Sequence, residues 1–257
     1  MGGGGFTMEP ENPALDEFIL GLPGKREPRI LLLPTASGDA DQQAGKFHAT
    51  FDDRPCEPSV LSLFRLGADG PQDLRALLLS QDVIYVGGGS MRNMLAIWRV
   101  HEIDTILRDA WQKGVVLAGL SAGAMCWFAG GVTKSSGTPE VARGLAFLPG
   151  SLSVHADGEP ERLPAYEAAV EGHDLPAGWA LDDGVGLLFR GDRMERVVTS
   201  RPGTHATWIE ATPGGLRRDV VEPELLVNPG PKADVARAMS SDVLEFRRAR
   251  YGASLRD

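Results

Sequence analysis

Residues 114–124 read Gly-Val-Val-Leu-Ala-Gly-Leu-Ser-Ala-Gly-Ala, a short apolar run followed by a serine between two glycines. The pattern Gly119-Leu-Ser-Ala-Gly123 is typical of a nucleophile elbow, where a strand turns sharply into a helix. The glycines leave room for the strained backbone of the turn. Because Ser121 then stands at a helix N-terminus, free N–H groups there favour developing negative charge. The stretch therefore predicts a serine hydrolase.

Apolar runs and helical periodicity alternate on either side of this stretch. Strands are expected at residues 29–34, 60–64, 81–86 and 115–119, and helices at residues 71–80 and 91–112. This alternation predicts an α/β fold with a doubly wound, mostly parallel sheet and helices on both faces. Catalytic groups are then expected at the carboxyl ends of the strands.

The C-terminal part has a different character. It is predicted to hold strands at residues 179–188, 193–200 and 204–210 and a closing helix at residues 232–251. No repeat or low-complexity linker interrupts the sequence, so residues 1–257 are interpreted as a single domain with a small β-rich C-terminal part.

Composition excludes several classes of function. The net charge of −9 argues against a nucleic-acid surface, and no apolar run reaches the roughly 18 residues of a membrane span. Two cysteines, Cys56 and Cys126, are too few for a disulfide framework and lack metal-ligand spacing. With no signal peptide visible, the sequence predicts a cytoplasmic protein that needs no metal or cofactor.

A serine nucleophile needs a histidine base, and the chain has five candidates: His48, His101, His155, His173 and His205. His155 stands out because it ends an apolar stretch, residues 145–154, that would return to the sheet edge. A position at the end of a strand suits a catalytic base.

The acid that orients the base has four candidates: Asp157, Asp174, Asp182 and Asp183. Asp182 and Asp183 interrupt an apolar strand, where a carboxylate is costly unless it is paired. Adjacent strand residues face opposite ways, so only one of the two can face the base. The alternative is a hairpin turn at Asp183-Gly184.

Two further glycine runs have open interpretations. Residues 87–89 fit neither phosphate-binding glycine pattern, but exposed backbone N–H groups there would also suit an oxyanion hole. Residues 2–5 are either a flexible start or the remnant of a loop that follows a strand upstream of Met1.

Taken together, these motifs resemble the peptidase E family, the aspartyl dipeptidases and their relatives, which include cyanophycinases. The resemblance rests on six features: residues 1–6, residues 33–38, residues 85–89, the Ser121 elbow, His155 and residues 181–184. It implies a fold similar to the class I glutamine amidotransferases, with serine in place of the nucleophilic cysteine.

The resemblance also implies roles for individual residues. Ser121 would be the nucleophile, His155 the base and Asp183 the acid. The backbone N–H groups of Gly88 and Ala122 would form the oxyanion hole. Gly89 and Arg162 would contact the substrate, Arg162 through a substrate carboxylate, unless Arg162 is simply an exposed loop arginine.

The implied function is hydrolysis of dipeptides or short peptides by a Ser-His-Asp triad, with Asp at the N-terminus as the family's preference, in a homodimer. Three alternatives stay open on the same scaffold. They are a carboxypeptidase-like enzyme, an isoaspartyl or cyanophycinase-like enzyme, and a catalytically silent relative that binds an anion or a partner.

Overall fold

Four parallel strands form the sheet that carries the serine elbow. The computed structural model describes residues 1–67 and 70–227. The strand order is β2 (Glu57–Val60), β1 (Arg29–Leu33), β3 (Val83–Val86) and β4 (Val116–Gly119). Every pair within this sheet is parallel, as predicted.

Helices cover both faces of this sheet, because its central strands are almost entirely apolar: β1 after Arg29 and the whole of β3 are buried. In β1, Ile30 and Leu32 pack against a cluster containing Phe6, Phe47 and Phe51, whereas Leu31 and Leu33 face the other cluster. The first face is covered by α1 (Gly5–Met8), α2 (Ala14–Gly21) and α3 (Asp41–Phe51). The second is covered by α4 (Leu74–Leu79), α5 (Met91–Val100), α6 (Ile103–Gln112) and α7 (Ala122–Met125). The predicted doubly wound α/β fold is confirmed.

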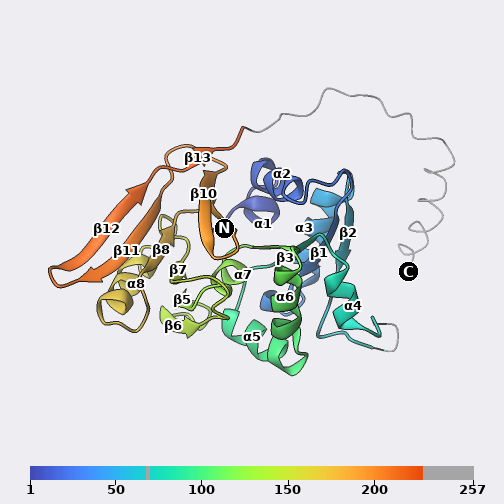
Figure 1. The fold of residues 1–257 in the computed structure, drawn as a ribbon, viewed down its shortest axis with the longest axis horizontal. Coiled ribbons are helices and arrows are strands. Elements are labelled where there is room, and N and C mark those ends of the chain that lie inside the picture. Colours follow the sequence, from blue (N-terminus) through green and yellow to red (C-terminus); the bar gives the residue numbers. More distant parts are fainter. Residues whose placement is uncertain (68–69, 228–257) are drawn as a thin grey trace.

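The second half of the chain adds further sheets beside the first (Figure 1). One has the order β13 (Glu224–Leu225), β10 (Arg193–Thr199), β9 (Val185–Arg190). Another has the order β12 (Gly215–Val221), β11 (Ala206–Thr212), β8 (Gly178–Leu181), β7 (Ser151–Ser153). The third pairs β5 (Gly130–Thr133) with β6 (Glu140–Arg143), and α8 (Arg162–Glu171) packs against this region. The predicted β-rich C-terminal part is therefore present.

Two predicted elements differ from the observed ones, and a third is not tested. The strand expected at residues 60–64 lies at Glu57–Val60, because Ser62 Oγ and Phe64 N instead donate hydrogen bonds to the Asp39 carboxylate. The helix expected at residues 91–112 breaks into α5 and α6 where Glu102 adopts a φ of 57°. The closing helix expected at residues 232–251 lies outside the described residues.

The strand expected at residues 179–188 is in fact two strands that belong to different sheets. β8 ends at Leu181 and β9 begins at Val185, so residues 182–184 form a crossing between sheets. The alternative of a hairpin turn at Asp183-Gly184 is also wrong, because β8 and β9 do not pair. Among the described residues, no helix has the length and apolar character to cross a membrane.

One buried carboxyl under the sheet gives a pH-dependent prediction. Asp16 in α2 is 1% exposed, and its Oδ1 accepts a hydrogen bond of 3.4 Å from the Tyr85 hydroxyl. Burial raises the pKa of Asp16 to about 7, against the opposing effect of these contacts. Because the unfolded carboxyl ionises near pH 4, the folded state retains a proton that the unfolded state loses between about pH 4 and 7.

The contribution of Asp16 to the free energy of unfolding is therefore complete below about pH 4 and is lost as the pH rises through about 7. We expect Asp16→Asn to gain stability relative to the unmodified chain over that interval, by up to about 4 kcal/mol. Urea unfolding at several pH values measures the difference. If the difference in free energy of unfolding between the two proteins stays constant from pH 4 to 8, folded Asp16 does not retain its proton.

Candidate active site

Ser121 stands at the turn from β4 into α7, with φ 53° and ψ −117°. Such a conformation is strained for a residue with a side chain and occurs where the surroundings enforce it. Here close packing does so: a Cβ on Gly119 would overlap the Gly123 carbonyl, and a Cβ on Gly123 would overlap the Val86 carbonyl. The predicted elbow is therefore present, and both glycines are required by contact.

The structure brings His155 and Asp183 to this serine. His155 follows β7, and its Nε2 lies 3.0 Å from Ser121 Oγ. Its Nδ1 lies 2.5 Å from Asp183 Oδ1, in the crossing between β8 and β9. Since a carboxylate only accepts, Nδ1 carries the proton that bonds Asp183 and leaves Nε2 to accept from the serine hydroxyl.

The other candidate acids have different partners. Asp182 Oδ2 accepts a hydrogen bond of 2.8 Å from the backbone N–H of His205. Asp157 Oδ1 accepts a bond of 2.8 Å from the backbone N–H of Asp183 and so holds that residue in place. Asp174 does not line the cavity around Ser121. Among these four candidate acids, which all lie in the described part of the chain, only Asp183 bonds the His155 ring.

The surroundings of Asp183 keep its carboxylate ionised. Burial opposes the charge, but the hydrogen bond and charge of His155, with smaller effects of Arg201 and Arg162, outweigh it and lower the pKa of Asp183. An ionised Asp183 is the form that can orient a histidine and stabilise its protonated state.

Backbone N–H groups are available beside the serine. Ala122 is the first residue of α7, and a Cβ on Gly88 would lie 3.2 Å from Ser121 Cβ, so Gly88 packs directly against the elbow. Gly89 has φ 140°, and a Cβ there would overlap the Ala36 carbonyl. Within the described part of the chain, no backbone acceptor takes the N–H of Gly88, Gly89 or Ala122. These three groups are therefore free to bond a ligand.

A cavity of about 550 Å³ opens over the serine. Its wall includes Ser121, His155, Gly89 and Ser90 and a set of polar or flexible side chains: Met125, Thr133, Lys134, Ser135, Glu159 and Arg162. The volume falls within the usual range for small-ligand sites, about 300–1,000 Å³.

Arg162 is not an exposed loop residue. It is the first residue of α8 and only 5% exposed. Its Nε and Nη2 lie 3.1 and 3.0 Å from Glu159 Oε2, while its buried Nη1 has no hydrogen-bond partner among the described residues. Burial lowers the pKa of Arg162, and the neighbouring Glu159 opposes that effect. The site thus holds a desolvated cation with donor capacity left over.

Sequence reasoning did not single out four residues of the cavity wall: Thr133, Lys134, Ser135 and Glu159. Lys134 forms a 2.9 Å ion pair with Glu161. These residues come from β5, the loop after it and the loop after His155, whose sequences carry no recognisable motif. Of the remaining histidines, His48, His101, His173 and His205 do not line the cavity.

Fold and elbow together define an α/β protein of the nucleophile-elbow type. The model of peptidase family S51 matches residues 1–197 of the chain. The chain is also 47% identical over 206 residues to the uncharacterized peptidase YgaJ of Bacillus subtilis (strain 168), an alignment that covers 80% of this chain and 88% of YgaJ. The chain belongs to peptidase family S51, which confirms the predicted relationship and makes it a peptidase.

Solved structures agree with the fold. A peptidase from an acI-B1 Actinobacterium superposes with a TM-score of 0.63 at 20% identity, covering 86% of this chain and 94% of that one. A protein from Listeria monocytogenes EGD-e assigned to peptidase E gives a TM-score of 0.51 at 15% identity, over 70% and 90% of the two chains.

Proposed function

We propose that this peptidase is a serine exopeptidase that hydrolyses dipeptides or short peptides with Ser121, His155 and Asp183 as its catalytic triad. The observation that carries the proposal is the unbroken chain of contacts from Ser121 Oγ to His155 Nε2, at 3.0 Å, and from His155 Nδ1 to Asp183 Oδ1, at 2.5 Å. The strained backbone of Ser121 supports it, because strain of this kind gathers at functional sites.

In the proposed reaction, Ser121 Oγ attacks the carbonyl carbon of the scissile peptide bond. His155 Nε2 takes the hydroxyl proton and delivers it to the leaving amine, so that an acyl-enzyme forms and the amine departs neutral. Water then attacks the ester in the same manner, with His155 again as base, and releases the acid. Asp183 stays ionised and holds the imidazole in the required tautomer.

The negative oxygen of the tetrahedral intermediate needs donors on the side of the elbow. The N–H of Ala122, helped by the N-terminal end of α7, and the N–H of Gly88 are the proposed pair. Both are without backbone acceptors in the described structure, and the loss of one such donor typically costs about 3 kcal/mol of transition-state stabilisation.

Charged side chains of the cavity suit a substrate with charged ends. Arg162 is buried with one nitrogen unpartnered, and we propose that it binds a substrate carboxylate, either an aspartyl side chain or a chain terminus. Glu159, which already bonds Arg162, lies at the same wall and suits a terminal ammonium group. A site that neutralises chain ends in this way favours short peptides over internal bonds of a long chain.

A panel of peptides tests this function. Asp-Xaa dipeptides, other dipeptides, and versions blocked at either terminus are incubated with the protein, and the products are identified by mass spectrometry. Cleavage of short peptides only when one terminus is free supports an exopeptidase, and restriction to Asp-Xaa gives the aspartyl dipeptidase. Cleavage of internal bonds in long peptides, or of none of the peptides, would contradict the proposal.

Arg162→Gln should separate binding from chemistry. We expect kcat/KM for carboxylate-bearing peptides to fall about 10- to 100-fold, the range for losing a hydrogen bond to a charged group. Hydrolysis of an uncharged activated ester should change by less than about threefold, since Arg162 does not contact the triad hydroxyl. Arg162→Lys, which keeps the charge but not the paired donors of the guanidinium, is the matched control. Its kcat/KM for carboxylate-bearing peptides should lie between those of the unmodified protein and Arg162→Gln. Equal losses on both substrates would show that Arg162 supports the fold of the site instead of the substrate.

A further inference from the structure

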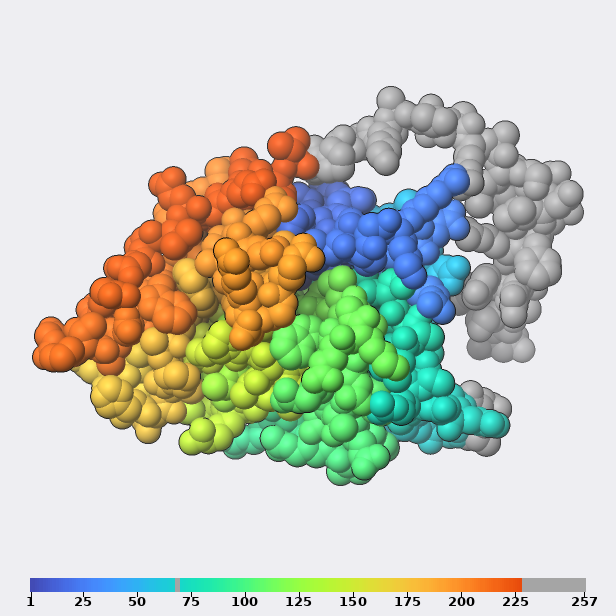
Figure 2. Space-filling model, viewed as in Figure 1, coloured from blue at the N-terminus to red at the C-terminus, as the bar shows by residue number. Residues whose placement is uncertain are grey.

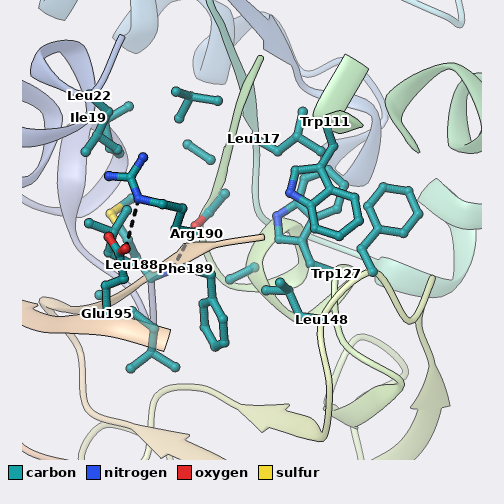
Figure 3. Close-up of a pocket in the computed structure, with 18 of the residues that line it drawn as sticks. Ile19, Leu22, Trp111, Leu117, Trp127, Leu148, Leu188, Phe189, Arg190 and Glu195 are labelled. Atoms are coloured by element: carbon teal, nitrogen blue, oxygen red, sulfur yellow. Dashed lines mark hydrogen bonds and ion pairs between the residues drawn. The ribbon is translucent and has the colours of Figure 1, made fainter. Parts of the chain in front are cut away.

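A second cavity lies away from the triad, in the gap between β4 and β9. Its volume is about 410 Å³, and its walls are almost entirely apolar, with a charged pair, Arg190 and Glu195, at one end. Figure 3 shows Ile19 and Leu22 on one side of it and Trp111, Trp127 and Leu148 on the other. In the space-filling view the orange β9–β10 hairpin lies beside the green α6 segment and the blue N-terminal residues (Figure 2).

Two strand edges line this second cavity, which we call the groove. β4 pairs only with β3, and β9 pairs only with β10, among the strands that the structure describes. Residues 116–118 of β4 are only partly buried, whereas every residue of the neighbouring β3 is buried. Residues 187–189 of β9 are likewise partly buried. An apolar strand that lies between packed layers is normally paired along both edges, whereas β4 and β9 each have one unpaired edge in the described structure.

Met1 already behaves as the last residue of such a neighbour. Its N donates to the Gly119 carbonyl at 2.8 Å, and its own carbonyl accepts from the N–H of Ser121 at 3.1 Å. These two bonds are the pattern of a parallel pair with β4. On the other side, Gly2 N donates to the Val185 carbonyl at 2.8 Å and Gly184 N to the Gly3 carbonyl at 3.3 Å, so the segment runs antiparallel to β9.

We propose that the groove binds an extended strand of about five or six residues that leads directly into Met1. This strand runs parallel to β4 and antiparallel to β9. A strand of this length spans about 17–20 Å, and β9, which forms one wall, has six residues. With it in place, the sheets β2-β1-β3-β4 and β9-β10-β13 become one continuous sheet. The glycine run at residues 2–5 is then the loop that follows this strand.

The side chains that line the groove determine which residue types the bound strand should have. Apolar side chains stand on both faces of the groove, so the strand should be apolar at every position after the first, as β1 is. A polar residue is expected only at its first position, beside the Arg190–Glu195 pair. Burial lowers the pKa of the Met1 amine to about 5, and a peptide N–H at that place would donate the same bond without a charge.

Hydrogen exchange measured by NMR at single amides tests the proposal. The N–H of Val116 points toward β3, where it donates to the Asp82 carbonyl, and the Gly184 carbonyl points toward β10, where it accepts from the N–H of Ser200. Because these directions alternate along a strand, every second N–H of β4 and β9 points into the groove. These are the N–H groups of Leu117, Gly119, Leu187 and Phe189. The probe is an N-terminal extension Lys-Val-Ile-Val-Ala-Val fused directly before Met1. The matched control replaces the central Ile of this extension with Pro, which removes a ladder donor.

In the chain that begins at Met1, these four amides should exchange rapidly. The valine-rich extension should slow their exchange at least about 100-fold and raise Tm by about 5 °C or more, and the proline form should do neither. If the chain that begins at Met1 does not fold, the comparison of the two extended forms decides in the same way.

Three outcomes would overturn the proposal. Protection of the four amides already in the chain that begins at Met1 would mean that another segment of the chain fills the groove. Protection that appears only as a dimer forms, followed by light scattering, would assign the groove to a second copy. Equal behaviour of the valine and proline extensions would exclude a hydrogen-bonded strand. Because the readout is exchange and Tm, the result does not depend on the proposed peptidase specificity.

Discussion

Replacement of Ser121 by alanine is expected to lower kcat for peptide hydrolysis by at least roughly 10⁴-fold, since removal of the nucleophile leaves only binding and the oxyanion donors. The fold should persist, because Ala keeps the Cβ and the contacts of the elbow are made by Gly119, Gly123 and their neighbours. Steady-state rates on the most active peptide, with circular dichroism and Tm as checks of folding, measure the effect.

Ser135→Ala is the matched control for this change. Ser135 lines the same cavity as Ser121, but its hydroxyl bonds Thr133 and not His155. Its loss should alter kcat by less than about threefold, within the range of surface polar substitutions. A Ser121→Ala protein that hydrolyses peptides normally would remove Ser121 from the chemistry altogether.

Two neighbouring aspartates should respond very differently to the same substitution. Asp183→Asn replaces the acceptor of the His155 Nδ1 proton with a group that can also donate, which favours the wrong tautomer, and a loss of roughly 10⁴-fold in kcat is expected. Asp182→Asn changes an acceptor for the backbone N–H of His205 and leaves His155 untouched, so kcat should fall by less than about tenfold.

Each variant controls for the other, because both change one carboxylate to an amide in the same three-residue crossing between β8 and β9. Rates at saturating peptide and Tm are measured for both proteins. The reverse ranking of kcat would move the acid to Asp182, and equal small effects would mean that His155 works without a carboxylate partner.

The elbow could be predicted from sequence because it is local. A strand, a tight turn and a helix start lie within eleven residues. Gly119 and Gly123 are dictated by contacts inside that stretch or with the adjacent β3. The parallel sheet was predictable for a related reason: β1 and β3 are apolar at nearly every position, which is typical of strands buried on both faces.

The choice of acid lay beyond local reasoning. Alternation along a strand says that Asp182 and Asp183 diverge, but which one meets His155 depends on the crossing from β8 to β9, two strands of different sheets. The interpretation of residues 179–188 as one strand was wrong for the same reason. Apolar runs report burial and not strand partners.

The burial of Arg162 was equally hidden. A sequence of Gly-Glu-Pro-Glu-Arg looks like a polar loop, yet the pairing with Glu159 and the packing of α8 place this arginine in the cavity wall. Lys134 and Ser135 reach the same wall through the loop between β5 and β6, whose position is set by tertiary contacts alone.

If Ser121 is activated by His155, it should react with a fluorophosphonate probe. The probe reacts only with a serine made nucleophilic by a neighbouring base, and peptide mapping by mass spectrometry identifies the modified residue. We expect one modified residue, Ser121, with labelling abolished in Ser121→Ala and strongly slowed when His155 is replaced by alanine. Absence of labelling in a folded protein, or labelling that is unchanged by loss of His155, would contradict this expectation.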